Sequence, residues 1–509
     1  MKRREFFQVI GGSVVAAGFA PALLAAAGKK DDKPLPRFGD GRDWFFQKRF
    51  GMFVHWGLYA IHGFHEQEQW RARVPRAEYV KLAQQWNPVK FNPDAWLDLL
   101  EQAGMKYICL TTKHHDGFCL FNSKLTKFNT INTPYGKDIV KQLAEACHRR
   151  KVPLCLYYSI ADWNQPNYPN EGRHHELPPQ PGDQPDWMKY LEFLKGQVRE
   201  LCTNYGEIHG FWWDMNVPKH VDRSINDMIR KLQPKAVINN RGFDDGDFGT
   251  PERDYEKDES IGFDRPTEAC QAVGTESWGY RKNEDYYTDR HLFRSIDKYL
   301  ARDGNYLLNV GPQPDGTIGP NETAILQRVG KWYGAVKESL ENVTPASMLT
   351  SNRNVLLTRC GKALYVHLYK DPTSESVKLK PSRFLLSENS CCNASVVPEI
   401  TAVSKPNRND PSAATIALIN NIRRPPCPPP ALDLHRHSFI ALWPLFPTNR
   451  NATPAFSPRA RSRLHFCESV IFSEPAFPPT ICSMGRSNSS FATSTVLHIS
   501  LAGSLRRRR

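Results

Sequence analysis

The feature that most constrains the fold is a regular alternation of short apolar runs and longer amphipathic stretches over residues 42–337. The short runs are rich in β-branched and aromatic residues, which is typical of buried strands, and the longer stretches have the spacing of helices. Repeated strand–helix alternation over this length favours an α/β fold, a (β/α)₈-like barrel. An open doubly wound sheet is the alternative, but no Gly-x-Gly-x-x-Gly motif follows an early strand.

We assign the catalytic barrel to residues 38–342. The predicted strands are residues 51–55, 107–113, 153–159, 210–214, 236–241 and 305–310. The predicted helices are residues 75–86, 93–103, 137–151, 185–205, 221–232 and 322–337.

The chain after the barrel divides into two parts. Two short runs, 355–359 and 363–369, predict a hairpin that begins a small β-sandwich module over residues 343–380. Residues 381–509 hold sixteen prolines and fourteen arginines to one lysine, without a sustained period, so we expect an irregular or disordered tail. This change in composition comes before the β module has enough strands to form a sandwich. A reading-frame shift that truncates the module and a genuine disordered tail both remain open.

The N-terminus has the pattern of an export signal. Arg3-Arg4 precedes Phe6, a short apolar stretch follows, and small residues at Ala25 to Ala27 offer a cleavage site. We predict a signal peptide over residues 1–27, of the twin-arginine type, and a bacterial periplasmic or extracellular protein. No stable membrane span is expected after its removal, because the apolar run is short.

The net charge of +14 is unevenly distributed along the chain. Residues 381–509 hold fifteen Lys and Arg against six Asp and Glu, and so supply +9 of that charge. The barrel region has no basic helix with interleaved aromatic residues. We therefore do not expect nucleic acid as a partner.

Polar and aromatic residues gather where the predicted strands end, which is where barrel enzymes place their active sites. These endings are His55-Trp56, Lys113-His114-His115, Tyr157-Tyr158, Trp212-Trp213-Asp214 and Asn239-Asn240-Arg241. Adjacent residues of a regular strand face opposite ways, so His114 and His115 are poorly placed to share a metal ion. Without a His-x-His or His-Glu-x-x-His pattern, we expect neither a metal nor another cofactor.

Such a pocket suits sugar hydrolysis, which needs two carboxyl groups with different roles. Asp214 is the best-placed first carboxylate. Glu252, Glu256 and Glu268 all follow the fifth predicted strand and are candidates for the second.

Several motifs resemble glycoside hydrolase family 29, the α-L-fucosidases, over about residues 42–380. They are FGMFVHWG at 50–57, TKHHDGF at 112–118, WD at 213–214, SWGY at 277–280 and NYLLNVGP at 305–312. The resemblance implies a (β/α)₈-like barrel followed by a β-sandwich. It also implies metal-free hydrolysis of terminal α-L-fucose from glycans, with retention through a covalent fucosyl-enzyme intermediate. A fucosylated oligosaccharide or glycoconjugate is then the expected partner.

The resemblance also assigns roles to individual residues. It places the nucleophile on Asp214 and, through the segments NNR at 239–241 and DFGTPE at 247–252, the acid/base on Glu252. Glu268 resembles a second acidic position of the family and is the rival. The implied substrate-binding residues are His55, Trp70, His114, His115, Tyr158, Trp212 and Arg241.

One departure from the family's pattern is that Gln69 precedes Trp70, where many members have glutamate. It leaves open which glutamate of this loop, if any, touches the sugar. A non-catalytic fucose-binding protein remains the alternative function.

Overall fold

The protein is described here from a computed structural model. It describes, with side chains, residues 34–172, 175–215, 222–253, 262–361, 363–371 and 377–380, and beyond these the backbone of three strands. The predicted signal peptide at 1–27 lies outside the described residues, as does most of the predicted tail at 381–509.

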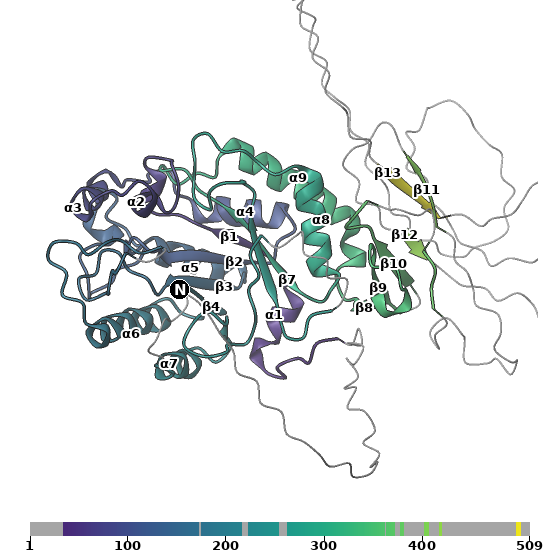
Figure 1. The fold of residues 1–509 in the computed structure, drawn as a ribbon, viewed down its shortest axis with the longest axis horizontal. Helices are drawn as coiled ribbons and strands as arrows, with labels where there is room; N and C mark the ends of the chain where they lie inside the picture. The colour runs from purple at the N-terminus through teal and green to yellow at the C-terminus, as the bar shows by residue number, and fades with distance from the viewer. Residues whose placement is uncertain are drawn as a thin grey trace, which may run out of the picture. The chain divides into compact units, whose positions relative to one another are not determined.

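Parallel strands form the central sheet, in the order β5-β4-β3-β2-β1-β7-β6. Figure 1 labels β1, β2, β3, β4 and β7 of this sheet. The strands are β1 (Phe50–Val54), β2 (Tyr107–Lys113), β3 (Leu154–Ser159), β4 (Gly210–Asp214), β5 (Val237–Ile238), β6 (Glu268–Ala272) and β7 (Asn305–Val310). The longer helices are α4 (Pro93–Gln102), α5 (Ile139–Arg150), α6 (Trp187–Asn204), α7 (Ser224–Leu232), α8 (Asp289–Leu300) and α9 (Pro320–Val336). Short helices are α1 (Trp44–Gln47), α2 (Glu68–Arg71) and α3 (Arg76–Tyr79). The arrangement is the (β/α)₈-like barrel that the alternation predicts.

Among the strands of the central sheet and the longer helices, the structure adds two elements that the sequence analysis does not predict, β6 and α8. The sequence of β6, Glu-Ala-Cys-Gln-Ala, has no β-branched residue, and its extended form comes from pairing with β7. The predicted fifth strand is shorter than expected. It ends at Ile238, because the Asn239 side chain turns back to hydrogen-bond the backbone N–H and C=O of Trp213, both at 2.9 Å.

The place of an eighth strand, between β5 and β6, is taken by residues 248–252. Parallel bridges join Asn239 to Phe248, Gly249 to Thr267 and Glu252 to Cys270. Backbone hydrogen bonds follow the same path, with Asn240 N donating to Phe248 O at 3.0 Å and Cys270 N to Pro251 O at 3.1 Å. Pro251 has no N–H to donate, which keeps this ladder irregular. The circle of strands thus continues from β5 to β6, and Glu252 lies at the carboxyl end of the added segment.

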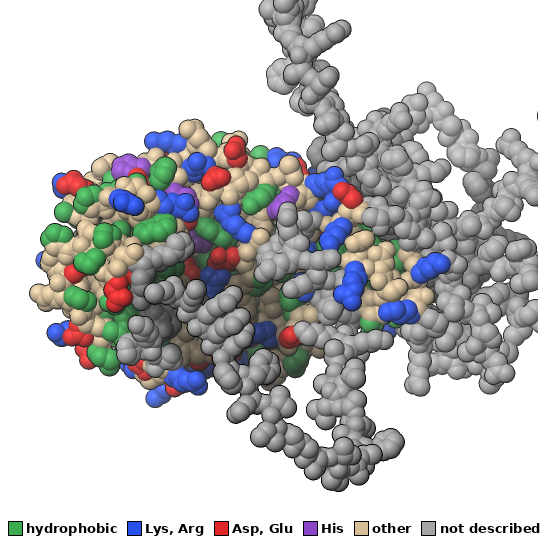
Figure 2. All heavy atoms as spheres, viewed as in Figure 1, with side chains coloured by type: hydrophobic (Ala, Val, Ile, Leu, Met, Phe, Trp, Pro, Cys, Tyr) green, Lys and Arg blue, Asp and Glu red, His purple; other side chains and the backbone are tan. Residues whose placement is uncertain are grey.

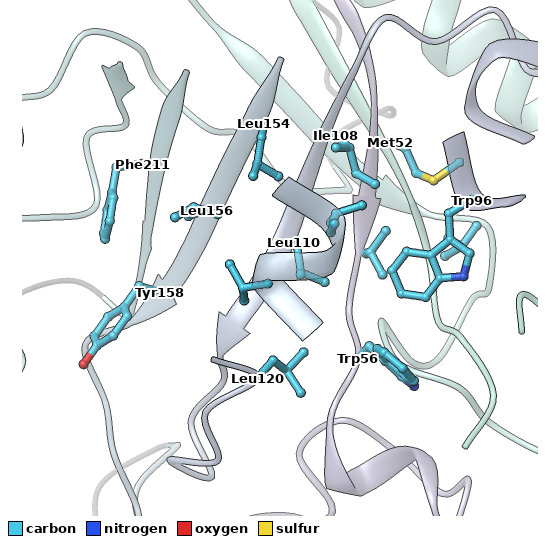
Figure 3. Packing of buried hydrophobic residues seen from close by; sticks show 14 of the residues in the cluster. Met52, Trp56, Trp96, Ile108, Leu110, Leu120, Leu154, Leu156, Tyr158 and Phe211 are labelled. Carbon is cyan, nitrogen blue, oxygen red and sulfur yellow. The ribbon is translucent and has the colours of Figure 1, made fainter. Parts of the chain in front are cut away.

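Two hydrophobic cores lie on the two faces of the sheet. The outer core fills the space between strands and helices, and Figure 3 shows Met52, Ile108, Leu110, Leu156 and Phe211 within it. The inner core fills the barrel and includes Phe53, Tyr107, Cys109, Tyr157, Trp212 and Leu307. Alternate residues of each strand supply the two cores because successive side chains point to opposite faces.

Helix α1 packs across the amino ends of the strands. The Trp44 indole donates to the carbonyl oxygen of Lys235, just before β5, and its ring lies 5.5 Å from that of Tyr107 at the start of β2. The amide of Asn305, at the start of β7, donates to the Phe45 carbonyl at 2.8 Å. This end of the barrel is therefore closed, and the opposite end is left for a site.

A small antiparallel sheet follows the barrel, in the order β12-β10-β9-β8. Its strands are β8 (Thr344–Pro345), β9 (Leu356–Cys360), β10 (Ala363–His367) and β12 (Ala417–Ile419). β9 and β10 are the predicted hairpin. The strands β11 (Ala402–Pro406) and β13 (Thr495–Ile499) pair with each other. Together with β12, they give the segment that was expected to be irregular three short strands.

The charged side chains of the described part are mixed in sign. On the face seen in Figure 2, acidic and basic side chains lie among polar and apolar ones. Among the described residues, no helix combines the length and the apolar character that a membrane crossing requires.

Candidate active site

Asp214 is the last residue of β4 and points toward the barrel axis, as Trp212 does two residues earlier. Its carboxylate accepts hydrogen bonds from Tyr157 Oη at 2.7 Å, Arg241 Nη1 at 3.0 Å and the Met215 backbone N–H at 2.8 Å. The Met215 backbone has φ of 70°, a left-handed conformation that brings its N–H back onto the carboxylate.

The surroundings of Asp214 favour its ionised form. Burial by itself would raise the pKa of Asp214, but three groups outweigh it and hold this pKa below its usual value. They are His115, which is protonated only in the acidic range where Asp214 titrates, Arg241 and the Tyr157 hydroxyl. His115 Nε2 lies 3.8 Å from Oδ2 of Asp214. The aspartate is therefore available as an anion for attack on an electrophilic carbon.

Arg241 connects Asp214 to Glu252. The same Nη1 atom that contacts Asp214 lies 2.5 Å from Glu252 Oε1. Thr250 holds the other side of the guanidinium, accepting from Nε through Oγ1 at 2.7 Å and from Nη2 through its carbonyl at 2.9 Å. The Arg241 guanidinium also lies 4.7 Å from the Trp212 ring centroid. These contacts fix the fork of the arginine between the two carboxylates.

Glu252 differs from Asp214 in exposure and in the direction of its pKa shift. Its side chain is 41% exposed, against 17% for Asp214. Partial burial raises the pKa of Glu252, the charge of Asp214 raises it further, and Arg241 only partly offsets these effects. The pair thus consists of one carboxyl group that favours ionisation and one that favours its proton.

His55, His114 and His115 converge on the same end of the barrel. The His114 ring centroid lies 5.8 Å from that of His55 and 3.9 Å from that of His115. The two adjacent histidines can lie together because β2 ends at Lys113, so the alternation of a regular strand no longer applies. Within the described part of the chain, no three His, Cys, Asp or Glu side chains are grouped to hold a metal ion.

Burial keeps these histidines neutral. It lowers the pKa values of His55 and His115 to about 4 and that of His114 well below its usual value. His55 Nδ1 lies 2.6 Å from Asn309 Oδ1, and His115 Nδ1 lies 2.7 Å from Ser159 Oγ. The Nδ1 atom of His114 is buried without a hydrogen-bond partner. Neutral imidazoles both donate and accept, which suits the recognition of sugar hydroxyls.

The expectation that Tyr158 lies in this pocket is wrong. Tyr158 belongs to the outer core, as Figure 3 shows, and its hydroxyl donates to Gln197 of α6 at 2.6 Å. Its neighbour Tyr157 points into the barrel and donates to Asp214. The strand period explains the error, since inward-facing Trp212 and Asp214 are in register with Tyr157 and Ser159.

Glu268 is likewise not beside Asp214. It is the first residue of β6, is 2% exposed and lies inside the barrel. Its carboxyl accepts hydrogen bonds from Tyr107 Oη at 2.5 Å and Trp212 Nε1 at 3.1 Å. Of the two candidate partners of Asp214 that the structure describes, Glu252 is the one joined to it through Arg241. The third candidate, Glu256, lies outside the described residues.

The two predicted tryptophans occupy different places. Trp212 is buried in the inner core beneath Arg241, whereas Trp70 in α2 is partly exposed. The Trp70 ring lies 4.9 Å from that of His175. The carbonyl of His175 accepts the Trp163 indole N–H at 2.9 Å, and Trp163 packs 5.4 Å from His115. Trp70 is thus linked to the histidines through two intermediate residues.

The residue-by-residue assignment from sequence left out Tyr157, Asn309, Trp278 and Glu66. Trp278 lies 5.3 Å from the His55 ring, and its backbone N–H donates to Glu66 at 2.9 Å. Glu66 also accepts from Ser277 Oγ at 2.8 Å, so its carboxylate ties the loop after β1 to the loop after β6. A signal was present, because Asn309 and Trp278 lie within two of the motifs quoted above.

Comparison with known proteins agrees with this geometry. The α-L-fucosidase family model matches residues 31–338. The tissue α-L-fucosidase of Rattus norvegicus is 29% identical, over 73% of this chain and 84% of its own length. A solved structure of α-L-fucosidase isoenzyme 1 from Paenibacillus thiaminolyticus is 35% identical with a TM-score of 0.60, over 66% of this chain and 85% of its own.

A second solved structure is the trapped covalent intermediate of an α-L-fucosidase from Bacteroides thetaiotaomicron, in complex with 2-fluoro-fucosyl fluoride. It is 26% identical with a TM-score of 0.59, over 70% of this chain and 88% of its own. The family model spans more than half of the sequence and includes every residue of the site described above. This chain therefore belongs to the α-L-fucosidase family of glycoside hydrolases.

Proposed function

We propose that this α-L-fucosidase releases terminal fucose with retention of configuration, with Asp214 as nucleophile and Glu252 as acid/base. In the first step Asp214 attacks the anomeric carbon while Glu252 gives its proton to the departing glycosidic oxygen. In the second step Glu252, now ionised, removes a proton from water, which attacks the same carbon and frees Asp214. The observation that carries this proposal is the Arg241 bridge between the two carboxylates.

The spacing of the pair supports retention. Arg241 Nη1 lies 3.0 Å from Asp214 Oδ1 and 2.5 Å from Glu252 Oε1, so the two oxygens are no farther apart than the sum of these distances. Retaining pairs lie roughly 5 to 5.5 Å apart, and inverting pairs lie roughly 6.5 to 9.5 Å apart to admit a water. The trapped covalent intermediate of the Bacteroides thetaiotaomicron relative supports the same mechanism.

The electrostatics support the division of roles. Asp214 is stabilised as an anion, which a nucleophile requires, and the pKa of Glu252 is raised, which a proton donor requires. When Asp214 becomes an ester in the intermediate, its charge is lost. The raising effect of that charge on the pKa of Glu252 then disappears, and Glu252 becomes ready to act as a base.

The remaining residues suit recognition of a sugar. The neutral imidazoles of His55, His114 and His115 can hydrogen-bond ring hydroxyls, and the unpartnered Nδ1 of His114 leaves one such group free. The indole of Trp278 beside His55 offers an apolar face. A fucosylated oligosaccharide or glycoconjugate is the substrate that we propose.

We also propose that the protein is exported. This rests on the Arg3-Arg4 signal pattern at the N-terminus, outside the described residues. Mass determination of the protein purified from a bacterial periplasm tests it, since cleavage after residue 27 gives a mature start at Gly28. A full-length mass for the exported protein would contradict cleavage.

Hydrolysis of an aryl α-L-fucoside followed by proton NMR tests the mechanism. We expect α-L-fucose as the first product and no turnover by Asp214→Ala. Incubation with 2-fluoro-fucosyl fluoride should label Asp214 covalently, as peptide mass spectrometry would reveal. A β-configured first product, or a label on another residue, would refute the assignment. Binding of fucose by wild-type protein without turnover would favour the non-catalytic alternative.

Leaving-group dependence tests Glu252. For Glu252→Ala we expect a large loss on a substrate with a poorly acidic leaving alcohol and a small loss on an activated aryl fucoside, because less protonation is needed there. Added azide should restore turnover and give fucosyl azide of retained configuration. Equal loss on both substrates, without azide rescue, would assign the proton transfer to another group.

A further inference from the structure

One buried carboxyl group next to the site has no part in the proposed chemistry. Glu268 lies inside the barrel at the amino end of β6, in register with Asn305 at the amino end of β7. Both of its oxygens are engaged, one by Tyr107 Oη at 2.5 Å and the other by Trp212 Nε1 at 3.1 Å. Burial of a carboxyl group is costly unless such donors satisfy it, and here it also raises the pKa of Glu268 to about 7.

Trp212 connects this carboxyl group to the site. The Tyr157 ring stacks on the indole, with centroids 5.6 Å apart and planes inclined by 18°. The guanidinium of Arg241 lies 4.7 Å from the same indole ring. Tyr157 and Arg241 are also the two side chains that donate hydrogen bonds to Asp214, at 2.7 Å and 3.0 Å. The indole is therefore packed against both of these donors.

The indole has only one polar atom, Nε1, and its single hydrogen bond is to Glu268. A flat ring packed among Phe53, Tyr157 and Arg241 is confined by van der Waals contact on its faces. Within that packing, the hydrogen bond at its edge is the directional polar contact that restrains the two side-chain torsions of Trp212. Loss of the bond would remove that restraint from the ring against which both donors pack.

We infer that Glu268 is a positioning residue, which holds Trp212 and thereby the Tyr157 and Arg241 donors that orient and ionise Asp214. The inference rests on the proposed role of Asp214 as nucleophile. It gives Glu268 a role other than proton transfer to the leaving group. Its two oxygens face Tyr107 and Trp212, while Glu252 shares Arg241 with Asp214.

The test compares Glu268→Leu with Glu268→Gln. Leucine removes the acceptor for Trp212, whereas the glutamine carbonyl keeps it and its amide can still bond Tyr107 Oη. We expect Glu268→Leu to lower kcat on the order of 10²-fold, equally on activated and poor leaving groups, because a displacement of about 1 Å has that effect. The acidic limb of its kcat/KM profile should move to higher pH, because Asp214 loses donors. Glu268→Gln should restore both values.

Trp212→Phe is the second measurement, and it also decides the matter if Glu268→Leu does not fold. It keeps an aromatic face but removes the N–H, so it should reproduce the loss and the shifted limb. Combined with Glu268→Leu it should add no further loss, because both changes break one bond. Tyr107→Phe is the matched control, because it removes the other hydrogen-bond donor to Glu268 and leaves the hydrogen bond from Trp212. The acidic limb of its kcat/KM profile should stay at the wild-type pH.

The outcomes separate this inference from the proposed mechanism. The inference alone would be overturned if Asp214→Ala were inactive while Glu268→Leu or Trp212→Phe kept the wild-type kcat and the wild-type acidic limb of kcat/KM. Azide rescue of Glu268→Leu, with activity kept on activated substrates, would overturn it by making Glu268 the acid/base. Normal turnover by Asp214→Ala would instead refute the proposed nucleophile, whatever the Glu268 variants do.

Discussion

The hydroxyl of Tyr157 offers the sharpest test of how this site controls its nucleophile. It donates to Asp214 Oδ2 at 2.7 Å from a buried position in the barrel. Tyr157→Phe removes that donor and leaves the ring and its stacking on Trp212. Tyr158→Phe is the matched control, because the next residue along β3 loses an equally buried hydroxyl that bonds Gln197 on the opposite face of the sheet.

The magnitude follows from the energy of the lost bond. A hydrogen bond to a charged group contributes about 1.5–3 kcal/mol. Since one pKa unit corresponds to about 1.4 kcal/mol, losing the bond should raise the pKa of Asp214 by about one to two units. The pKa of Asp214 is lowered in the folded protein, so the change is toward its ordinary value. The acidic limb of kcat/KM should therefore move up by about one to two pH units in Tyr157→Phe.

The assay is the pH dependence of kcat/KM on an activated aryl α-L-fucoside, with denaturant unfolding of each variant beside it. Tyr158→Phe should keep the wild-type limb but lose about 1–3 kcal/mol of unfolding free energy, because Gln197 is left with an unsatisfied buried acceptor. A limb that shifts in Tyr158→Phe and not in Tyr157→Phe would refute the reasoning. So would unshifted limbs in both variants.

Three further changes test contacts that hold the barrel and its loops. Lys113→Met breaks the fully buried 2.8 Å ion pair with Asp162. Denaturant melts should show an unfolding free energy lower by about 3–5 kcal/mol, because the Asp162 charge is left without its partner. An unchanged unfolding free energy would contradict a buried, charged pair. His367→Ala, in the polar contact between β10 and α8, should cost about 3 kcal/mol of unfolding free energy and leave kcat/KM unchanged; altered kinetics would contradict a purely structural role. Glu66→Ala should raise KM for the aryl fucoside more than it lowers kcat, since Trp278 loses its anchor beside His55; an unchanged KM would count against Trp278 as a sugar-contacting face.

Sequence patterns predicted elements well where local composition and burial agree. β2, β4 and β7 have the predicted bounds, because each is an apolar run flanked by turn residues and buried on both faces. β6 was missed because its residues have little β propensity, so its extended form depends on pairing with β7. α8 was missed although a signal was present. Thr288 caps it, accepting from the His291 N–H, and apolar residues at Leu292, Ile296 and Tyr299 lie on its buried side.

What the sequence determined by itself is the kind of barrel and the inventory of the site. The alternation of strand and helix patterns, and polar residues at strand ends, placed His55, His114, His115, Asp214 and Arg241 at one end of a parallel barrel. These features are local, since each depends on residues within one strand and the turn after it.

Only the tertiary structure decided which side chains meet. Whether Tyr157 or Tyr158 faces Asp214 depends on strand register, since a shift of one residue exchanges the two faces. The difference between Glu252 and Glu268 depends on contacts with other strands and loops. The carboxyl group of Glu252 meets Arg241 in the segment after β5, whereas that of Glu268 is enclosed with Tyr107 of β2 and Trp212 of β4. Burial and neighbouring charges set the pKa of each, and both come from residues distant in the chain.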